Sequence, residues 1–188
     1  MHFLAYLAAA TLVSAEAFSI SVFAPNTDVD GAILHAYDHG FATQLEGPAT
    51  YCPLKPETDC PKVAGTLVSM NMEYMAVQVP GGQEIYVGAD GQVQYMTAHS
   101  HALPPGAIVG GWFHKGIESA CLGPLAHDLA DFTDGKGNGG LVLCPVDWTI
   151  KGSTLYAKTK GFKEKGCTDI LGLQMTLSNS SVGCWQYN

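Results

Sequence analysis

The chain has 188 residues, of which 47% are hydrophobic and 14% charged, and its formal net charge at pH 7 is −8. High hydrophobicity with few charges excludes a disordered chain, and the length fits one domain with its own core. All of the basic residues are lysines. Because arginine is the preferred residue for phosphate recognition, an acidic chain without it is a poor nucleic-acid binder.

The first seventeen residues predict a secretory signal peptide. An uncharged apolar run, Phe3–Val13, leads into two sites of the A-x-A type that end at Ala15 and Ala17. The run has about 11 residues, which is too short for a bilayer that needs roughly 20. We therefore expect residues 1–17 to be a signal peptide cleaved after Ala15 or Ala17. The rest, 18–188, should be one secreted β-rich domain without membrane insertion.

Short strand patterns bounded by turn residues follow along the chain. Alternating apolar residues predict a strand at Phe18–Val22, and Asp90-Gly91 predicts a type I′ hairpin turn. The segment 103–140 is the least regular, and one short helix is predicted near Gly123–Asp131. These patterns indicate an all-β fold, a single-domain antiparallel sandwich or barrel with disulfides and one short helix. The predicted strands are Phe18–Val22, Thr66–Met70, Tyr74–Val79, Glu84–Val87, Val93–Met96, Leu141–Cys144, Thr154–Ala157, Leu171–Leu177 and Val182–Tyr187.

Six cysteines follow the predicted signal peptide, and an even number in a secreted chain indicates three disulfides. Cys52 and Cys60 enclose a short segment with two prolines, so we expect them to form one pair. The residues alone leave the pairing of the other four open. No C-x-x-C spacing occurs, which disfavours a zinc framework. The remaining cysteines are Cys121, Cys144, Cys167 and Cys184.

Several segments resemble a family of small secreted fungal proteins, the IgE-binding or PhiA-type cell-wall proteins. The resemblance covers about residues 49–187, and the stretch Gly81–Val87 is its most specific part. The segments that carry it are Ala49–Pro53, Val79–Val87, Asp90-Gly91, Tyr95–Ser100, Leu143–Pro145, Gly166-Cys167 and Cys184–Tyr187.

The resemblance implies a β-rich protein of a filamentous ascomycete, extracellular or associated with the cell wall, in a family with allergenic members. It implies no catalytic residues. It favours the pair Cys144–Cys167, which leaves Cys121 with Cys184. The alternative, Cys121 with Cys144 and Cys167 with Cys184, stays open.

Two histidine pairs invite a metal interpretation. His35 and His39 are four residues apart, and His99 and His101 are two apart, so each pair would share one face of a helix or strand. His35 does not lie in a helical pattern, and we expect no metal and no cofactor at either pair.

Acidic residues offer two further patterns. Asn26, Asp28, Asp30 and Gly31 resemble the front of a calcium loop, but the closing glutamate is missing, which favours a polar turn. The acids Asp128, Asp131 and Asp134 could belong to a glycosidase pair. We expect them instead to mark a solvated turn or helix end.

The predicted surface features are a sequon, a lysine-rich segment and three tryptophans. Asn179 begins an N-x-S/T sequon between two apolar segments, which predicts a glycosylated surface turn. Five lysines within 151–165 are expected to keep a loop solvated, with a patch for anionic glycans or lipid head groups as the alternative. Trp112, Trp148 and Trp185 could line a carbohydrate-binding face, although a role in the core is favoured.

Together these patterns predict no enzyme. We expect a non-enzymatic secreted fungal protein, extracellular or cell-wall associated, that contacts wall polysaccharide or a host extracellular protein, as an effector, elicitor or allergen does. The alternatives are a carbohydrate-binding module and a secreted hydrolase of unfamiliar type. Binding to insoluble chitin or glucan would favour the module, and paired acids in a deep cleft would favour the hydrolase.

Overall fold

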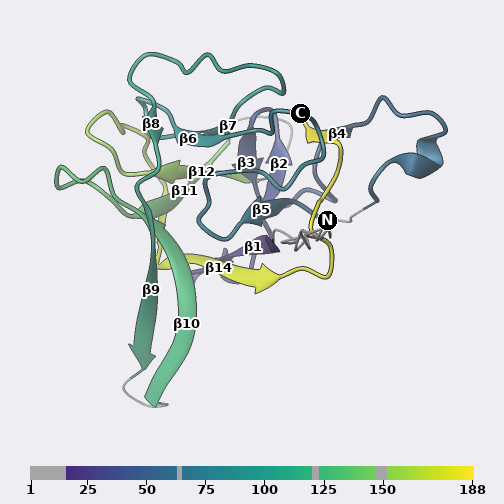
Figure 1. Ribbon diagram of the computed structural model, residues 1–188. Coiled ribbons are helices and arrows are strands. Elements are labelled where there is room, and N and C mark those ends of the chain that lie inside the picture. The colour runs from purple at the N-terminus through teal and green to yellow at the C-terminus, as the bar shows by residue number, and fades with distance from the viewer. Residues whose placement is uncertain (1–15, 63–64, 120–122, 147–151) are drawn as a thin grey trace, which may run out of the picture.

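The structure is a computed structural model that describes residues 16–62, 65–119, 123–146 and 152–188 (Figure 1). Within these ranges the regular structure consists of β-strands and one 3-10 turn, η1 (Glu57–Asp59), which confirms the all-β prediction. The strands are β1 (Ala17–Phe23), β2 (His35–Tyr37), β3 (Gly40–Ala42), β4 (Thr50–Tyr51), β5 (Leu67–Ser69), β6 (Ile85–Val87), β7 (Val93–Tyr95), β8 (Ile108–Val109), β9 (Trp112–Ser119), β10 (Gly123–Phe132), β11 (Leu141–Pro145), β12 (Ser153–Ala157), β13 (Thr168–Ile170), β14 (Gly172–Leu177) and β15 (Gln186–Tyr187).

A five-stranded antiparallel sheet has the order β5-β1-β14-β10-β9. Its β1 strand alternates as the sequence predicts, with Ile20 and Val22 buried and Ser21 between them half-buried. The register pairs Val22 with Leu173 of β14, so both apolar side chains point to one face. That face is the inner side of this sheet.

The larger sheet has eight strands in the order β13-β11-β12-β3-β7-β6-β8, with β2 paired to β3. Inner residues of both sheets, for example Ile20 and Leu173 of the first and Val93 and Leu155 of the second, belong to one hydrophobic cluster. In the view of Figure 1, β1 and β14 lie below β11, β12 and β3. The two antiparallel sheets therefore share one core and together form a curled half-barrel.

The C-terminal strand is anchored by a buried polar network. Gln83 donates from Nε2 to the carbonyls of Met96 and Tyr187, and the Tyr187 amide donates back to Gln83 Oε1. The Tyr187 hydroxyl accepts from the Leu67 amide at 2.9 Å and lies 3.2 Å from the Gly65 carbonyl, to which it donates. Because each buried polar group finds a partner, the network stabilises the contact between β15 and β5.

The first strand begins inside the predicted signal peptide. Ala17 is 1% exposed, pairs with Ser69 of β5, and accepts a 2.8 Å hydrogen bond from the Ser178 amide. Ala17 is therefore a structural residue of β1. Residues 1–15, which carry most of the predicted signal peptide, lie outside the described residues.

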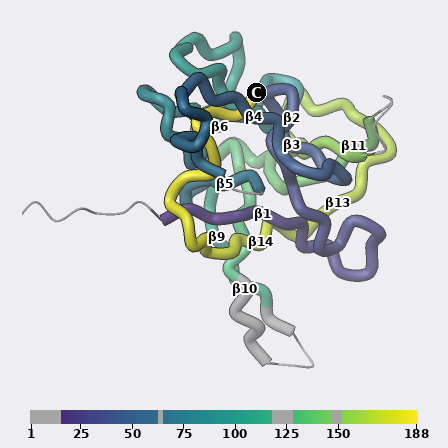
Figure 2. The backbone as a smooth tube through the Cα atoms, turned by 90° about the vertical axis from the view of Figure 1, so that its right-hand side faces the viewer, coloured from purple at the N-terminus to yellow at the C-terminus, as the bar shows by residue number. Residues whose placement is uncertain are grey.

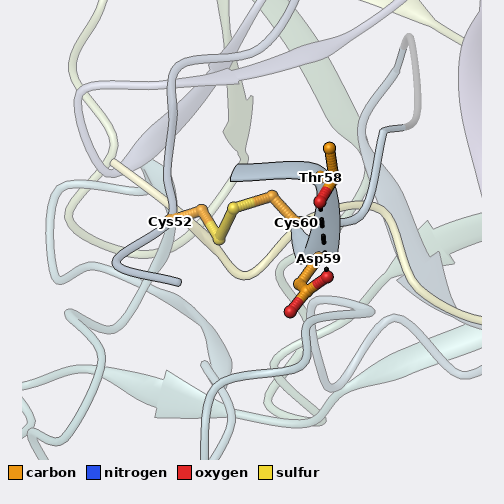
Figure 3. Close-up of a disulfide and its surroundings, with 4 residues drawn as sticks. All are labelled: Cys52, Thr58, Asp59 and Cys60. Atoms are coloured by element: carbon orange, nitrogen blue, oxygen red, sulfur yellow. Dashed lines mark hydrogen bonds between the residues drawn. A yellow bond between two sulfur atoms is a disulfide. The ribbon is translucent and has the colours of Figure 1, made fainter. Parts of the chain in front are cut away.

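Two of the three predicted disulfides are formed. Cys52–Cys60 closes the surface loop that holds η1, where Thr58 and Asp59 lie close to the bridge (Figure 3). Cys144–Cys167 joins β11 to the segment before β13. The pair Cys144–Cys167, which the family resemblance implies, is thus confirmed, and the alternative that joins Cys121 to Cys144 is wrong.

Cys184, one half of the third predicted pair, is a buried free thiol. Its backbone carbonyl accepts from the Gln78 amide and it bridges Val77, which holds it near the β5 edge of the five-stranded sheet. Cys121, its predicted partner, lies outside the described residues.

The predicted helix near Gly123–Asp131 is wrong, because β10 occupies these residues. β10 pairs antiparallel with β9 on both sides of a register shift between Leu125 and Leu129, and near Leu129 also with β14. Figure 1 and Figure 2 show β10 extending away from the body of the protein. Pairing with a neighbouring strand thus overrides the weak local pattern.

The hairpin at Asp90-Gly91 joins β6 to β7 as predicted, but its turn is of another type. Only Gly91 of the two has a positive φ, 97°, and its amide donates to the Gly88 carbonyl at 2.9 Å. A type I′ turn needs positive φ at both central residues. The chain therefore uses a turn with one left-handed glycine at its end.

The other predicted strands differ mainly in length. Tyr74–Val79 forms single bridges at Tyr74, Met75 and Val77 in place of a continuous strand. Of Val182–Tyr187, only Gln186 and Tyr187 are regular strand. The remaining predicted strands coincide with β1, β5, β6, β7, β11, β12 and β14.

Candidate functional site

A cleft of about 560 Å³ opens on the eight-stranded sheet. Ligand sites are typically clefts of about 300–1,000 Å³ with a few polar groups, so this cleft is the candidate site. Its walls come from the β2–β3 hairpin, from β7 and β12, and from the segments after β11 and β12. Its described lining residues are Tyr37, Asp38, His39, Phe41, Ala42, Thr43, Leu45, Gln92, Gln94, Pro145, Val146, Gly152, Thr154, Tyr156 and Glu164.

Strand alternation places polar side chains in the cleft. On β12, Leu155 and Ala157 belong to the core, whereas Thr154 and Tyr156 line the cleft. A bridge pairs Tyr156 with Gln92, so these two side chains lie on the same, outer face of the sheet. The face opposite the core therefore carries the cleft.

The next strand repeats the pattern. On β7, Val93 and Tyr95 are core residues and Gln94 lines the cleft. Gln94 lies opposite Gly40 of β3 in the register. A Cβ atom on Gly40 would lie 3.1 Å from Gln92 Nε2, so glycine leaves room for this amide against β3.

The turn between β2 and β3 forms one rim of the cleft. Tyr37 pairs with Gly40, and the two residues between them, Asp38 and His39, have φ values of 49° and 59°. Two positive φ angles define a type I′ hairpin turn, which normally contains glycine or asparagine. Such conformations cost about 1–3 kcal/mol each and cluster at ligand sites. The Tyr95 amide, which donates to the His39 carbonyl at 2.9 Å, helps to hold the turn.

The polar groups of the cleft are largely free to meet a ligand. Gln94 Nε2 donates to Gln92 Oε1 at a long 3.4 Å. The carboxylates of Asp38 and Glu164 have no hydrogen bond or ion pair to any residue that the structure describes. The cleft thus presents amide donors and acceptors together with the carboxylates of Asp38 and Glu164, which have no partner among the described residues.

Tyr156 is a neutral hydrogen-bond donor at the floor of the cleft. Burial raises the pKa of its hydroxyl, and the nearby Glu164 and Asp90 carboxylates raise it further. Its ring packs against Phe162 with the centroids 6.0 Å apart. This contact supports the ring, and Tyr37 on the rim, which is 37% exposed, adds a second aromatic surface.

The predicted histidine pairs do not converge on a common site. His35 on β2 is buried, its Nδ1 has no partner among the described residues, and burial lowers the pKa of its imidazole. His39 lies on the cleft instead. His99 and His101 are exposed in the loop after β7. Across the described residues, no group of three or more His, Cys, Asp or Glu could hold a metal ion.

The calcium-like segment is a self-contained turn. Asp30 Oδ1 accepts from the Ala24 amide at 2.8 Å, and Asn26 adopts a positive φ of 66°. The Gly31 amide donates to the Val22 carbonyl at 2.9 Å. These hydrogen bonds use the polar groups to close the loop after β1, as the polar-turn interpretation predicts.

The three aspartates of 128–134 serve separate local roles, and the expected solvated turn or helix end is wrong for Asp128 and Asp131, which lie in β10, where Asp131 is buried. Asp128 is 2.9 Å from His114 Nδ1, and Lys115 Nζ donates to the buried Asp131. Asp134 accepts from the Lys136 and Asn138 amides, and the Asn138 side-chain amide is the largest cause that lowers its pKa. No two of these acids share the cleft.

Of the tryptophans that the structure describes, Trp112 and Trp185, neither lines the cleft. Trp112 packs edge-on against Phe132, with the ring centroids 5.6 Å apart, at the margin of the core. Trp185 is half-buried beside Val79, whose amide donates to its carbonyl. Trp148 lies outside the described residues. For Trp112 the favoured core interpretation is confirmed.

Asn179 lies exposed in the turn that follows β14, where a glycan can be accommodated. In the lysine-rich segment, Lys158 forms an ion pair with Asp169 of β13, while Lys160, Lys163 and Lys165 are exposed. Lys151 lies outside the described residues. The exposed lysines fit the interpretation of a solvated loop.

Sequence reasoning missed Tyr37, Gln92, Gln94, Tyr156 and Glu164 as site residues. The outward position of Tyr156 and Gln94 could be predicted from strand alternation. The pairing of Gln92 with Tyr156 could not, because these two residues come from segments far apart in the chain.

Taken together, the fold and the site define a disulfide-bonded all-β protein with a polar, aromatic-lined cleft. The described residues contain no helix with the length and apolar character to span a membrane. No protein-family model and no solved structure matches the chain.

A relative from Arthroderma benhamiae, an uncharacterized secreted protein, is 32% identical over 145 residues. The match covers 74% of this chain and 70% of that protein. The chain therefore belongs to the same family of secreted fungal proteins, and it is itself a secreted protein, in keeping with its disulfides.

Proposed function

We propose that the protein acts outside the cell as a non-enzymatic binding protein, and that its cleft holds a segment of cell-wall polysaccharide. The observation that carries this proposal is the outer face of the eight-stranded sheet, where Tyr37 and Tyr156 flank the amides of Gln92 and Gln94.

The chemistry of these groups suits a sugar ring. A pyranose has apolar C–H faces that pack against aromatic rings, and a rim of hydroxyls that need donors and acceptors. Tyr37 and Tyr156 supply the aromatic surfaces. Gln92, Gln94 and Asp38 supply neutral and charged hydrogen-bonding partners.

A glycoside hydrolase is the second candidate, because Asp38 and Glu164 line the same cleft. Such enzymes use two carboxyl groups on either side of the scissile bond. Catalytic acids usually lie in desolvated pockets, whereas both of these side chains are exposed, so we place binding first. Release of reducing ends from polysaccharide, abolished by D38N or E164Q, would reverse that order.

We further propose that the secreted family is the IgE-binding, PhiA-type cell-wall family. The resemblance of Gly81–Val87 and Tyr95–Ser100 supports this, since these segments build β6, the end of β7 and the loop beyond it. Binding of the purified glycoprotein by IgE from mould-sensitised donors would test the allergen part. Recovery of the protein with a host extracellular protein, and not with wall material, would favour an effector.

The decisive experiment is a pull-down of the mature protein on insoluble chitin, chitosan and β-1,3-glucan. We expect retention on at least one polymer, and loss of retention for Tyr37→Ala and Gln92→Ala. Tyr51→Ala is the matched control, because Tyr51 is 52% exposed and lies outside the cleft. The proposal would be overturned if Tyr51→Ala and Tyr37→Ala lowered retention equally, or if no polymer retained the protein.

A further inference from the structure

A second hollow of about 200 Å³ adjoins the cleft. His39 and Gln94 line both hollows, so the two hollows share a border. At this size the second hollow is smaller than an independent ligand site of about 300–1,000 Å³. It is better described as a continuation of the cleft. Its lining residues are His39, Tyr86, Gln94, Tyr95, Met96, Thr97, Ser100 and Ala102.

The register of the sheet joins the two hollows on one surface. Gln92 lies opposite Tyr156, and Gln94 lies opposite Tyr86. Because Gln92 and Gln94 are two residues apart on one strand, they point to the same face. Tyr156, Gln92, Gln94 and Tyr86, here called the outer-face row, therefore cross the sheet from the cleft to the second hollow.

Polar groups continue into the second hollow. Thr97 is exposed there, and its hydroxyl makes no hydrogen bond to the described residues. Ser100 Oγ accepts a long 3.4 Å hydrogen bond from the Ala102 amide, and its hydroxyl proton is left for a ligand. Tyr86 stays protonated as a donor, since burial, and then the Asp90 carboxylate, raise the pKa of its hydroxyl.

We propose that the outer-face row is a track for a linear oligosaccharide, whose sugar units occupy the cleft and the second hollow at once. This inference rests on the proposed polysaccharide binding and adds its mode: an extended chain is recognised, and not a single sugar or a chain end. The second hollow, with Thr97 and Ser100, then acts as a subsite that only longer chains reach.

Calorimetric titration with laminari-oligosaccharides and chito-oligosaccharides of two to six units tests the track. We expect affinity to rise with length and then to level off once both hollows are filled. Thr97→Ala should lower the affinity for the hexasaccharide by about two- to tenfold, the worth of one hydrogen bond, and leave the disaccharide unchanged. Ala102→Leu, which fills the hollow from an exposed position, should remove the gain from length.

Two controls separate the track from the cleft. Thr176→Ala, at an exposed position on the other sheet, should match the unmodified protein at every length. His39→Asn, which suits a positive φ, should weaken binding at every length, because His39 lines both hollows.

The outcomes distinguish this inference from the function on which it rests. Equal affinity for the disaccharide and the hexasaccharide, with retention on polysaccharide still lost in Tyr37→Ala, would overturn the track and keep the cleft. Equal losses at all lengths in Thr97→Ala would do the same. Failure of the unmodified protein to bind any polysaccharide would overturn both.

Discussion

The two faces of the eight-stranded sheet differ although alternate residues of the same strands build both of them. The inner face presents Leu155 and Val93 to the core, while the outer face presents Tyr156 and Gln94 to the cleft. Alternate residues of one strand thus belong either to the core or to the lining of the cleft. Substitutions at adjacent positions should therefore have opposite consequences.

The largest expected effect tests this contrast at neighbouring residues. Leu155→Ala removes a fully buried side chain and should lower the free energy of unfolding by about 2–5 kcal/mol. Tyr156→Ala, one residue later on the outer face, should cost much less stability and abolish retention on polysaccharide. Urea unfolding of both variants provides the comparison. Equal destabilisation would show that the two faces are not divided in this way.

The two disulfides allow a second comparison, between a bridge at the eight-stranded sheet and a bridge in a surface loop. In the chain-entropy model, a bridge of sequence separation 23, Cys144–Cys167, stabilises by a little over 3 kcal/mol, and one of separation 8, Cys52–Cys60, by about 2.5. We expect the paired Cys→Ala variant at Cys144 and Cys167 to melt at the lower temperature. Its bridge also holds β11, which contributes Leu141 and Leu143 to the core. A lower melting temperature for the loop variant would contradict the ranking.

How much of the fold could be predicted from the sequence differs from strand to strand. Strands such as β1 and β12 were predictable, because alternation and nearby turn residues are local signals. The short strands β2 and β3 were not, since two or three residues become a strand only through partners distant in sequence. The same holds for the cleft. Asp38 and Glu164 line it together only because the fold brings segments far apart in the chain to one face of the sheet.

The N-terminus offers a sharper test of where the inner structure begins. Ala17 is buried in β1 and accepts a hydrogen bond from Ser178. A chain that started at Phe18 would lose that bond, which is worth about 1 kcal/mol, and would place its charged amino group at the strand. We therefore expect cleavage after Ala15 and a mature protein that begins at Glu16. Intact-mass measurement of the secreted protein decides, and a start at Phe18 would contradict the prediction.

His35 is an exception to the division between the faces. It lies opposite Ala42, which lines the cleft, and yet it is only 6% exposed. Burial lowers the pKa of its imidazole from 6.5, so the unfolded chain binds the proton more readily than the folded protein does. Stability from this group is therefore complete above about pH 6.5 and is lost as the pH falls below it. We expect His35→Gln to show a shallower fall of melting temperature between pH 7 and 5. Parallel curves for the two proteins would remove His35 as the cause.

The smallest effect is expected at Asn179, which belongs to neither face of the eight-stranded sheet. It lies exposed in the turn after β14, outside both hollows and outside the core. Asn179→Gln should remove one N-glycan, seen as a loss of mass that matches enzymatic deglycosylation. Stability should change by no more than about 0.5 kcal/mol, as is usual for surface substitutions, and retention on polysaccharide should be unchanged. Ser181→Ala, which breaks the same sequon and keeps the asparagine, is the matched control and should show the same loss of mass. A secreted wild-type protein that lacks the glycan would refute the prediction, because an exposed sequon in a secreted chain is otherwise open to the glycosylation machinery.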